Sequence, residues 1–157
     1  MNYLKEFHSL CINNNISIAT AESCTAGLLA SEITSIAGAS LFFRGGIIAY
    51  QNNIKINNLS VSSSLIKNYT EVSAIVVEKM AESIRQKLLA DVSIATSGYA
   101  GPEGGTDENP VGTVFIAISS KDKTVSRRFS FLGDRRSVVS QAVRSSLKLI
   151  VEHLKKQ

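Results

Sequence analysis

The alternation of apolar and polar residues along the chain follows the periods of helices and strands. Apolar side chains spaced three and four residues apart predict helices, while short apolar runs bounded by polar or glycine-rich residues predict strands. The helical segments are 1–14, 26–36, 73–89 and a final helix that begins after Gly133, with shorter helical pieces over 52–69. The predicted strands are 16–20, 41–50, 92–97, 111–119 and 124–131. Helices and strands therefore alternate, which indicates an α/β protein.

The connections between the predicted elements indicate the type of sheet. Helices separate the earlier strands, which allows these strands to lie parallel, but only the polar turn 120–123 separates the last two strands. Such a short connection requires an antiparallel pair. We therefore expect a three-layer α/β/α sandwich with a mixed, mostly parallel sheet, in which 41–50 is a buried strand. Ser73 and Asp134 are the expected N-caps of the two long helices.

The composition narrows the class of protein. A chain of 157 residues with 44% hydrophobic and 19% charged residues is typical of a globular protein, and we expect one domain over 1–157. No apolar run is long enough to span a bilayer and the first residues lack a secretory signal pattern, so we expect a cytoplasmic protein without a membrane partner. In that compartment Cys11 and Cys24 are free thiols. The net charge of +4 comes from scattered basic residues, and we expect no nucleic acid partner.

Three side chains near the apolar segment 41–50 are candidates for catalysis. Ser40, Tyr50 and Lys55 lie within sixteen positions, and a chain that turns back after Tyr50 would bring Lys55 toward Ser40. The two histidines belong to the terminal helices, so a lysine made neutral by burial is the available base for a serine nucleophile. Tyr50 would relay or orient the proton. Residues of these types also occur together in strands without any catalytic role, and that reading stays open.

Cys24 is a competing nucleophile, because backbone amides in a strand-to-helix turn lower the pKa of a thiol. The alternative reading of Cys24 is a small residue packed between strand and helix. The glycine-rich segment 98–106 matches neither phosphate-loop pattern, yet it follows the end of a strand, where open α/β sheets bind ligands. Its amides would hold a phosphate or a carbonyl oxygen, or the segment is a plain wide turn. Arg135, in the first turn of the last helix, either meets an anion or is solvated.

Five segments of the sequence, taken together, resemble one family. They are AESCTAGLLASEIT, IAGASLFFRGGIIAYQNNIK, EVSAIVVEKMA, SGYAGPEGGTDENPVGTV and FLGDR. Over 16–149 the chain is similar to the CinA C-terminal domain family, which includes stand-alone nicotinamide mononucleotide amidases. The resemblance implies an α/β/α sandwich, often dimeric, that deamidates nicotinamide mononucleotide to nicotinic acid mononucleotide and ammonia without a cofactor or metal.

The resemblance also implies roles for individual residues. The catalytic serine, tyrosine and lysine of the family match Ser40, Tyr50 and Lys55. The implied partners are a pyridine mononucleotide and, in a homodimer, a second copy of the chain. The implied substrate-binding residues are Glu22, Ser23, Thr25, Ser97, Gly98, Gly101, Gly104 and Gly105.

The sequence departs from the family pattern at several positions. Ala26 replaces a usual glycine, and Tyr99 replaces an aliphatic residue in the glycine-rich segment, where a larger ring changes which nucleotide fits. Two functions of other classes stay open beside the amidase. One is a non-catalytic nucleotide-binding module that uses the same pocket, and the other is a competence-associated or DNA-associated partner.

Overall fold

The computed structural model describes residues 2–157, so the first residue of the predicted 1–14 helix lies outside it. The helices are α1 (Tyr3–Asn13), α2 (Leu28–Thr34), α3 (Asn52–Leu59), α4 (Ser63–Tyr69), α5 (Ala74–Lys87) and α6 (Arg135–Leu154), with one 3₁₀ turn, η1 (Ala39–Leu41). The strands are β1 (Ile18–Glu22), β2 (Phe43–Ile48), β3 (Val92–Gly98), β4 (Thr113–Ser120) and β5 (Thr124–Ser130). The predicted order of helices and strands is confirmed.

The five strands form one sheet with the order β2-β1-β3-β4-β5. β1 pairs in parallel with both β2 and β3, whereas β4 is antiparallel to β3 and to β5. β4 is thus the one strand of this sheet that runs against the others. The prediction of a mixed, mostly parallel sheet is confirmed, and the tight β4–β5 connection has the antiparallel pairing that its length requires.

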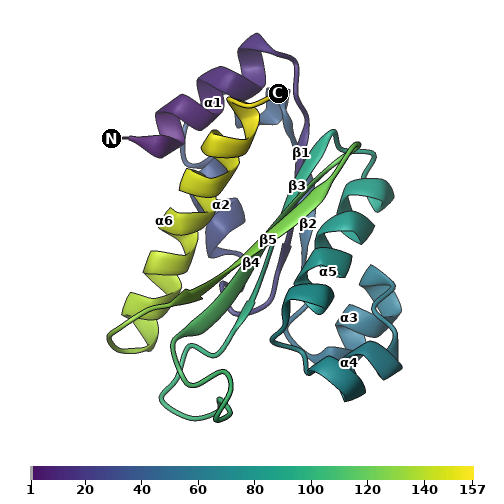
Figure 1. Cartoon of the computed structure of the whole chain (residues 1–157). Coiled ribbons are helices and arrows are strands. Elements are labelled where there is room, and N and C mark those ends of the chain that lie inside the picture. Colours follow the sequence, from purple (N-terminus) through teal and green to yellow (C-terminus); the bar gives the residue numbers. More distant parts are fainter. Residues whose placement is uncertain (1) are drawn as a thin grey trace.

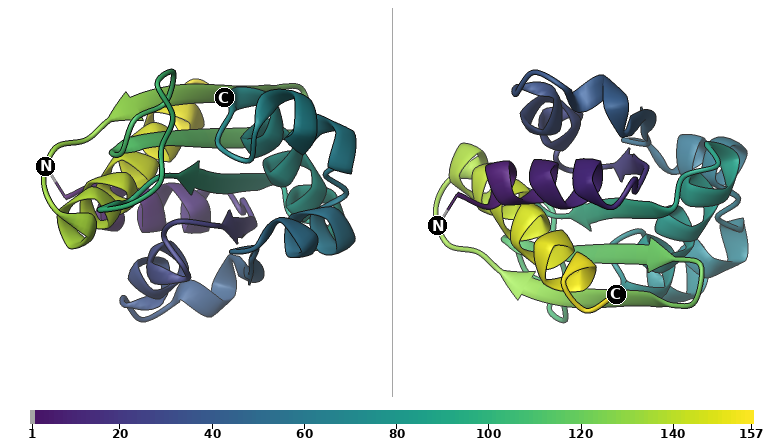
Figure 2. Two further views of the ribbon diagram at one scale, coloured as in Figure 1. Left: turned by 90° about the horizontal axis from the view of Figure 1, so that it is seen from below. Right: turned by 90° about the horizontal axis from the view of Figure 1, so that it is seen from above.

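Helices cover both faces of the sheet, as Figures 1 and 2 show. α1, α2 and α6 lie on one face, where Phe7, Leu29 and Ile150 belong to a buried apolar cluster. α3, α4 and α5 lie on the other face, where Met80 and Ile84 belong to a second cluster. The two clusters are the two halves of the core, so the predicted three-layer sandwich is confirmed.

The long helices begin where the sequence predicts. The Ser73 side chain accepts a hydrogen bond from the Val76 amide at 3.4 Å, and the Asp134 carboxylate accepts one from the Ser137 amide at 2.8 Å. These bonds satisfy amides in the first turns of α5 and α6 that have no partner within the helix.

β2 differs from its prediction as a buried strand. It lies at the edge of the sheet and pairs only with β1, so its residues alternate between half-buried and exposed along its length. Ile48, at the end of β2, is 54% exposed. The apolar run does not reveal this position, because an apolar strand at an edge and one at the centre have the same composition. Ser40 precedes the strand, in η1.

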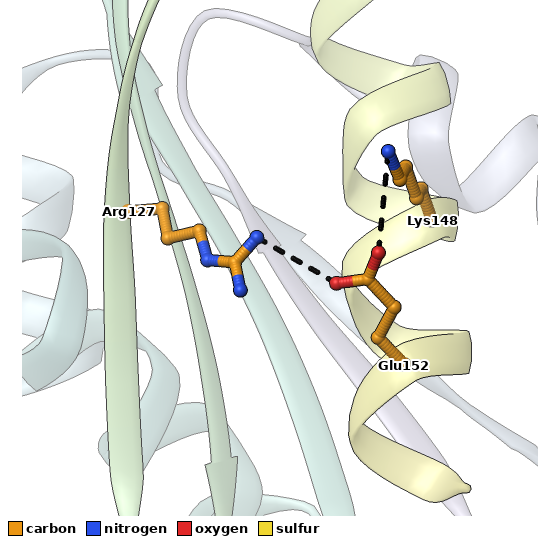
Figure 3. Close-up of polar contacts among 3 residues, drawn as sticks. All are labelled: Arg127, Lys148 and Glu152. Atoms are coloured by element: carbon orange, nitrogen blue, oxygen red, sulfur yellow. Dashed lines mark ion pairs between the residues drawn. The ribbon is translucent and has the colours of Figure 1, made fainter.

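One surface ion pair connects α6 to β5, and a second lies within α6. Figure 3 shows Glu152 of α6 between Arg127 of β5 and Lys148, with N–O distances of 3.6 and 4.0 Å. All three side chains are partly exposed to solvent, so each pair contributes no more than about 1 kcal/mol to the stability of the fold.

Cys11 and Cys24 are unpaired, as expected. Within residues 2–157, no helix combines the length and the apolar character needed to cross a membrane.

Candidate functional site

A cavity of about 350 Å³ lies beyond the ends of the parallel strands, and we call it the reaction cavity. β1, β2 and β3 run in the same direction, so the segments that follow their last residues meet at one edge of the sheet. Open α/β sheets bind ligands at this edge. The lining residues are Ser23, Cys24, Tyr50, Gln51, Asn52, Lys55, Glu71, Val72, Ser97, Gly98, Tyr99, Ala100, Gly101, Glu103 and Arg135.

Lys55 is the buried cation of the reaction cavity. It belongs to α3, which begins just after β2, and its side chain is only 1% exposed. Its Nζ donates a hydrogen bond to the Tyr50 carbonyl at 3.3 Å, and no ion pair within residues 2–157 involves it. Burial lowers the pKa of Lys55 below its ordinary value of 10.5, although the nearby Glu71 and Cys24 oppose the shift. A lysine with a lowered pKa is a better proton acceptor near neutral pH.

The structure does not bring Ser40 to Lys55. Ser40 is exposed and lies before β2, whereas Lys55 lies beyond the other end of that strand. β2 is extended and pairs with β1 along its length, and its six residues span roughly 20 Å. The expectation that the chain turns back and returns Lys55 to Ser40 is therefore wrong. Closeness in sequence is misleading here, because an extended strand has a large rise per residue and so places residues at its two ends far apart.

Ser97 and Ser23 both line the reaction cavity with Lys55. The Ser97 hydroxyl already donates to the Glu71 carbonyl at 2.7 Å, so Ser23 is the better candidate nucleophile. Ser23 follows the last residue of β1, it is 7% exposed, and its amide donates a hydrogen bond to the Thr96 carbonyl of β3 at 3.0 Å. From the sequence, Ser23 has only an implied role in substrate binding. Its position directly after a strand, in a strand–turn–helix unit, is the signal that favours it over Ser40.

Cys24 lines the reaction cavity beside Ser23, but its thiol is poorly suited to attack. Burial raises the pKa of Cys24 to about 12, and this effect exceeds the opposing hydrogen bonds and the attraction of Lys55. The thiol is therefore protonated near neutral pH, where only a thiolate is strongly nucleophilic. The reading of Cys24 as a packed residue fits this environment better than the reading as a nucleophile.

Tyr50 and Arg135 both line the reaction cavity and are joined by a hydrogen-bonded bridge. Arg135 donates from Nη2 to the Tyr50 hydroxyl at 2.6 Å and from Nη1 to the Gly101 carbonyl at 2.7 Å. Tyr50 is 51% exposed, so its hydroxyl lies at the rim rather than in the interior. Sequence reasoning left Arg135 between anion binding and solvation, because nothing in the sequence indicates contact with a tyrosine 85 positions away.

Glu22 does not line the reaction cavity, contrary to its implied role in substrate binding. Its buried carboxylate accepts hydrogen bonds from the Thr25 hydroxyl at 2.6 Å, the Leu29 amide at 2.9 Å and the Ala30 amide at 3.1 Å. Leu29 and Ala30 are in the first turn of α2, so Glu22 caps this short helix. The Thr25 hydroxyl also lies 2.8 Å from the Thr96 hydroxyl, and it is occupied by this network.

The glycine-rich segment contributes part of the wall. Ser97, Gly98 and Gly101 line the reaction cavity, whereas Gly104 and Gly105 lie farther along the loop and do not line it. The Ser97 hydroxyl donates to the Glu71 carbonyl at 2.7 Å. Gly105 has a φ of +83°, and an added Cβ would lie 2.8 Å from the Val111 amide nitrogen, so this glycine shapes the loop.

A larger groove of about 750 Å³ lies between α1, α2 and α6. No lysine, cysteine or histidine of the described residues lines it, so it has no counterpart of Lys55 and Cys24 in the reaction cavity. No group of three or more histidine, cysteine, aspartate or glutamate side chains within residues 2–157 is arranged to hold a metal ion.

Comparisons with known proteins agree with this architecture. The chain is 41% identical to a CinA-like protein from Cytophaga hutchinsonii over 141 residues, which are 90% of the chain and 34% of the relative. It is 42% identical to a CinA-like protein from Shewanella sediminis over 135 residues, which are 86% of the chain and 32% of the relative. The chain thus spans about a third of the length of these relatives.

Solved structures and a family model match most of the chain. The crystal structure of the competence damage-inducible protein A from Klebsiella pneumoniae has a TM-score of 0.94 and 36% identity, and the match covers 98% of this chain and 95% of that one. The model of the CinA C-terminal domain matches residues 2–154. The chain therefore belongs to the CinA C-terminal domain family.

Proposed function

We propose that the chain is an amidohydrolase that deamidates nicotinamide mononucleotide to nicotinic acid mononucleotide and ammonia. The observation that carries this proposal is the pair formed by Ser23 and Lys55 in one cavity. Lys55 is buried, has a lowered pKa and makes no ion pair within residues 2–157, which are the properties of a general base rather than of a structural cation.

In the proposed mechanism, Ser23 attacks the carboxamide carbon while neutral Lys55 takes the hydroxyl proton. The tetrahedral intermediate collapses as Lys55 returns this proton to the leaving nitrogen, and ammonia departs. Lys55 then takes a proton from a water molecule that attacks the acyl ester, and it returns this proton to the Ser23 oxygen as the C–O bond breaks and nicotinic acid mononucleotide leaves. We propose that the backbone amides of Ala100 and Gly101 donate hydrogen bonds to the oxyanion of the intermediate. Both residues line the cavity, and their amides donate to no backbone acceptor in residues 2–157. Each such donor is worth about 3 kcal/mol.

The test measures ammonia release from nicotinamide mononucleotide by wild type and three variants. Ser23→Ala should lower kcat by about 10⁴-fold or more, because the nucleophile is lost. Ser40→Ala and Cys24→Ser should each stay within about threefold of wild type, since Ser40 lies outside the cavity and Cys24 is a protonated thiol. Loss of activity in Ser40→Ala with Ser23→Ala unaffected would overturn the assignment. A wild-type chain that binds the nucleotide without releasing ammonia would instead be a non-catalytic binding module.

The proposal extends to the location and assembly of the chain. We place the chain in the cytoplasm on its sequence pattern, and the family resemblance implies a homodimer; light scattering on the purified chain measures its mass directly. A monomer at micromolar concentration would contradict the dimer without bearing on the chemistry of Ser23 and Lys55.

A further inference from the structure

A second cavity, of about 520 Å³, lies beside the reaction cavity, and we call it the arginine cavity. The two cavities share Cys24, Tyr50 and Arg135 as common walls. The hydrogen bond from Arg135 to the Tyr50 hydroxyl therefore lies between them. A ligand of modest length that reaches past this bridge would occupy both cavities at once.

The two cavities differ in charge. Glu71 and Glu103 line the reaction cavity, whereas no carboxylate of the described residues lines the arginine cavity, which has the guanidinium groups of Arg135 and Arg136. The nearby Asp134 is already engaged, because its carboxylate accepts a hydrogen bond from the Ser137 amide at 2.8 Å. The arginine cavity is thus a positively charged compartment next to the proposed reaction centre.

Arg136 is the free cation of this compartment. It is exposed, and no ion pair within residues 2–157 involves it, whereas Arg135 donates to the neutral Tyr50 hydroxyl and Gly101 carbonyl. A guanidinium group binds a phosphate through two parallel hydrogen bonds, which makes arginine well suited to phosphate recognition. The hydroxyl of Ser140, one helical turn after Arg136, adds a neutral donor to the same wall.

Apolar side chains complete the arginine cavity. Ala26, Leu28 and Val139 form part of its lining, so the compartment is only partly polar. A free inorganic anion would leave this apolar surface uncovered, whereas an organic phosphate covers it with its carbon skeleton.

We propose that the arginine cavity binds the phosphate monoester of the substrate while the carboxamide lies between Ser23 and Lys55. This inference rests on the proposed function for the identity of the substrate. Arg136 is its specificity-determining residue, because it distinguishes a nucleotide from the corresponding unphosphorylated nucleoside. The ribose then passes the Tyr50–Arg135 bridge, which lies between the two compartments.

The first experiment compares kcat/KM for nicotinamide mononucleotide and for nicotinamide riboside in Arg136→Gln. We expect the ratio of the two values to fall at least tenfold, because only the nucleotide carries the phosphate. Arg144→Gln is the matched control, since Arg144 is an exposed arginine of the same helix that lines neither cavity. Its ratio should stay within twofold of wild type. An unchanged ratio in Arg136→Gln, or an equal fall in both variants, would overturn the proposal.

A second measurement separates this inference from the proposed function. Binding of ribose 5-phosphate by titration calorimetry needs no catalysis, and Arg136→Gln should raise its Kd at least tenfold relative to Arg144→Gln. If wild type releases no ammonia but this difference is found, the proposed function fails and the phosphate site stands. If ammonia is released and neither the ratio nor the Kd responds to Arg136→Gln, the phosphate site fails and the proposed function stands.

Discussion

Burial of the Lys55 ammonium destabilises the folded state, and the same burial gives Lys55 the lowered pKa that its proposed role as a base requires. Its ammonium is removed from water without an ion pair within residues 2–157, so burial lowers its pKa from the ordinary value of 10.5. At a pH between the lowered pKa of the folded chain and the ordinary pKa of the unfolded chain, the unfolded chain binds more protons at Lys55 than the folded chain does. The folded state therefore loses stability as the pH falls from about 10.5 through the lowered pKa, and the loss is complete below it.

Replacing Lys55 by methionine or arginine tests both its proposed role as general base and the loss of stability that its burial causes. Lys55→Met should be inactive, and its unfolding free energy relative to wild type should increase as the pH falls from about 10.5, because methionine has no proton to bind. Lys55→Arg should also be inactive, since a guanidinium keeps its proton. Urea denaturation at several pH values and ammonia release measure the two effects. An active Lys55→Arg enzyme would show that another group accepts the proton.

Ala26 is a second residue held in an unfavourable state, in this case by its backbone. Its φ is +46°, in the left-handed region, where a side chain costs about 1–2 kcal/mol relative to glycine. Ala26→Gly removes this strain, but glycine loses more conformational entropy on folding than alanine does. The unfolding free energy should therefore rise by only roughly 0.5–1 kcal/mol. Ala30→Gly, inside α2, should lower it by about 1 kcal/mol. An Ala26→Gly variant with a lower unfolding free energy than wild type would show that Ala26 is not strained at this turn.

At the scale of single elements, α2 depends on a residue outside it. It has seven residues, too few for a stable isolated helix, and its N-cap, Gly27, has no side chain to accept a hydrogen bond. Glu22, at the end of β1, supplies the acceptors for two amides of its first turn. The carboxylate thus joins the strand to the helix and holds the intervening turn, which carries Ser23, in place.

Removing the Glu22 carboxylate should loosen this unit. Glu22→Ala should lower the unfolding free energy by about 3 kcal/mol, because buried donors lose their acceptor. Glu22→Gln keeps one oxygen acceptor and should cost roughly half as much. Glu32→Ala, at an exposed position of the same helix, should change the value by less than about 0.5 kcal/mol. Urea denaturation provides the comparison, and equal effects of Glu22→Ala and Glu32→Ala would disprove the capping role.

At the scale of the whole molecule, the candidate site depends on where the sheet places distant segments. Residues that follow β1, β2 and β3 meet at one edge, and the first turn of α6 returns there to supply Arg135. The bridge from Arg135 to Tyr50 therefore joins the last helix to the segment that follows an edge strand. Such a contact forms only when the layers have packed.

A double-mutant cycle measures this long-range link. Tyr50→Phe and Arg135→Gln each remove the same hydrogen bond, so their effects on the unfolding free energy should be non-additive by about 1 kcal/mol. The exposure of Tyr50 keeps the coupling near the lower end of the usual range. The pair Tyr50→Phe and Arg136→Gln should be additive, because Arg136 donates no hydrogen bond to Tyr50. Additivity in both cycles would show that the bridge does not form in solution.

The sequence by itself determined most of the elements and the layered architecture. The spacing of apolar residues placed the helices and strands, and side chains such as Ser73 and Asp134 marked where helices begin. These features are local, since a period of 3.6 or 2 residues and a cap both act within a few positions. Lys55 is buried, as predicted, although the apolar segment before it is a half-exposed edge strand and not the buried strand on which that prediction relied.

Only the tertiary structure decided which side chains share the site. Ser40 and Lys55 are close in sequence but lie beyond opposite ends of β2, whereas Ser23 lines the same cavity as Lys55 although 32 positions separate the two in the sequence. Arg135 reaches Tyr50 from the last helix, and Glu22 turns away from the reaction cavity to cap α2. Strand order, strand direction and the packing of helices set these neighbours. None of them follows from local periodicity, because each depends on contacts between segments far apart in the chain.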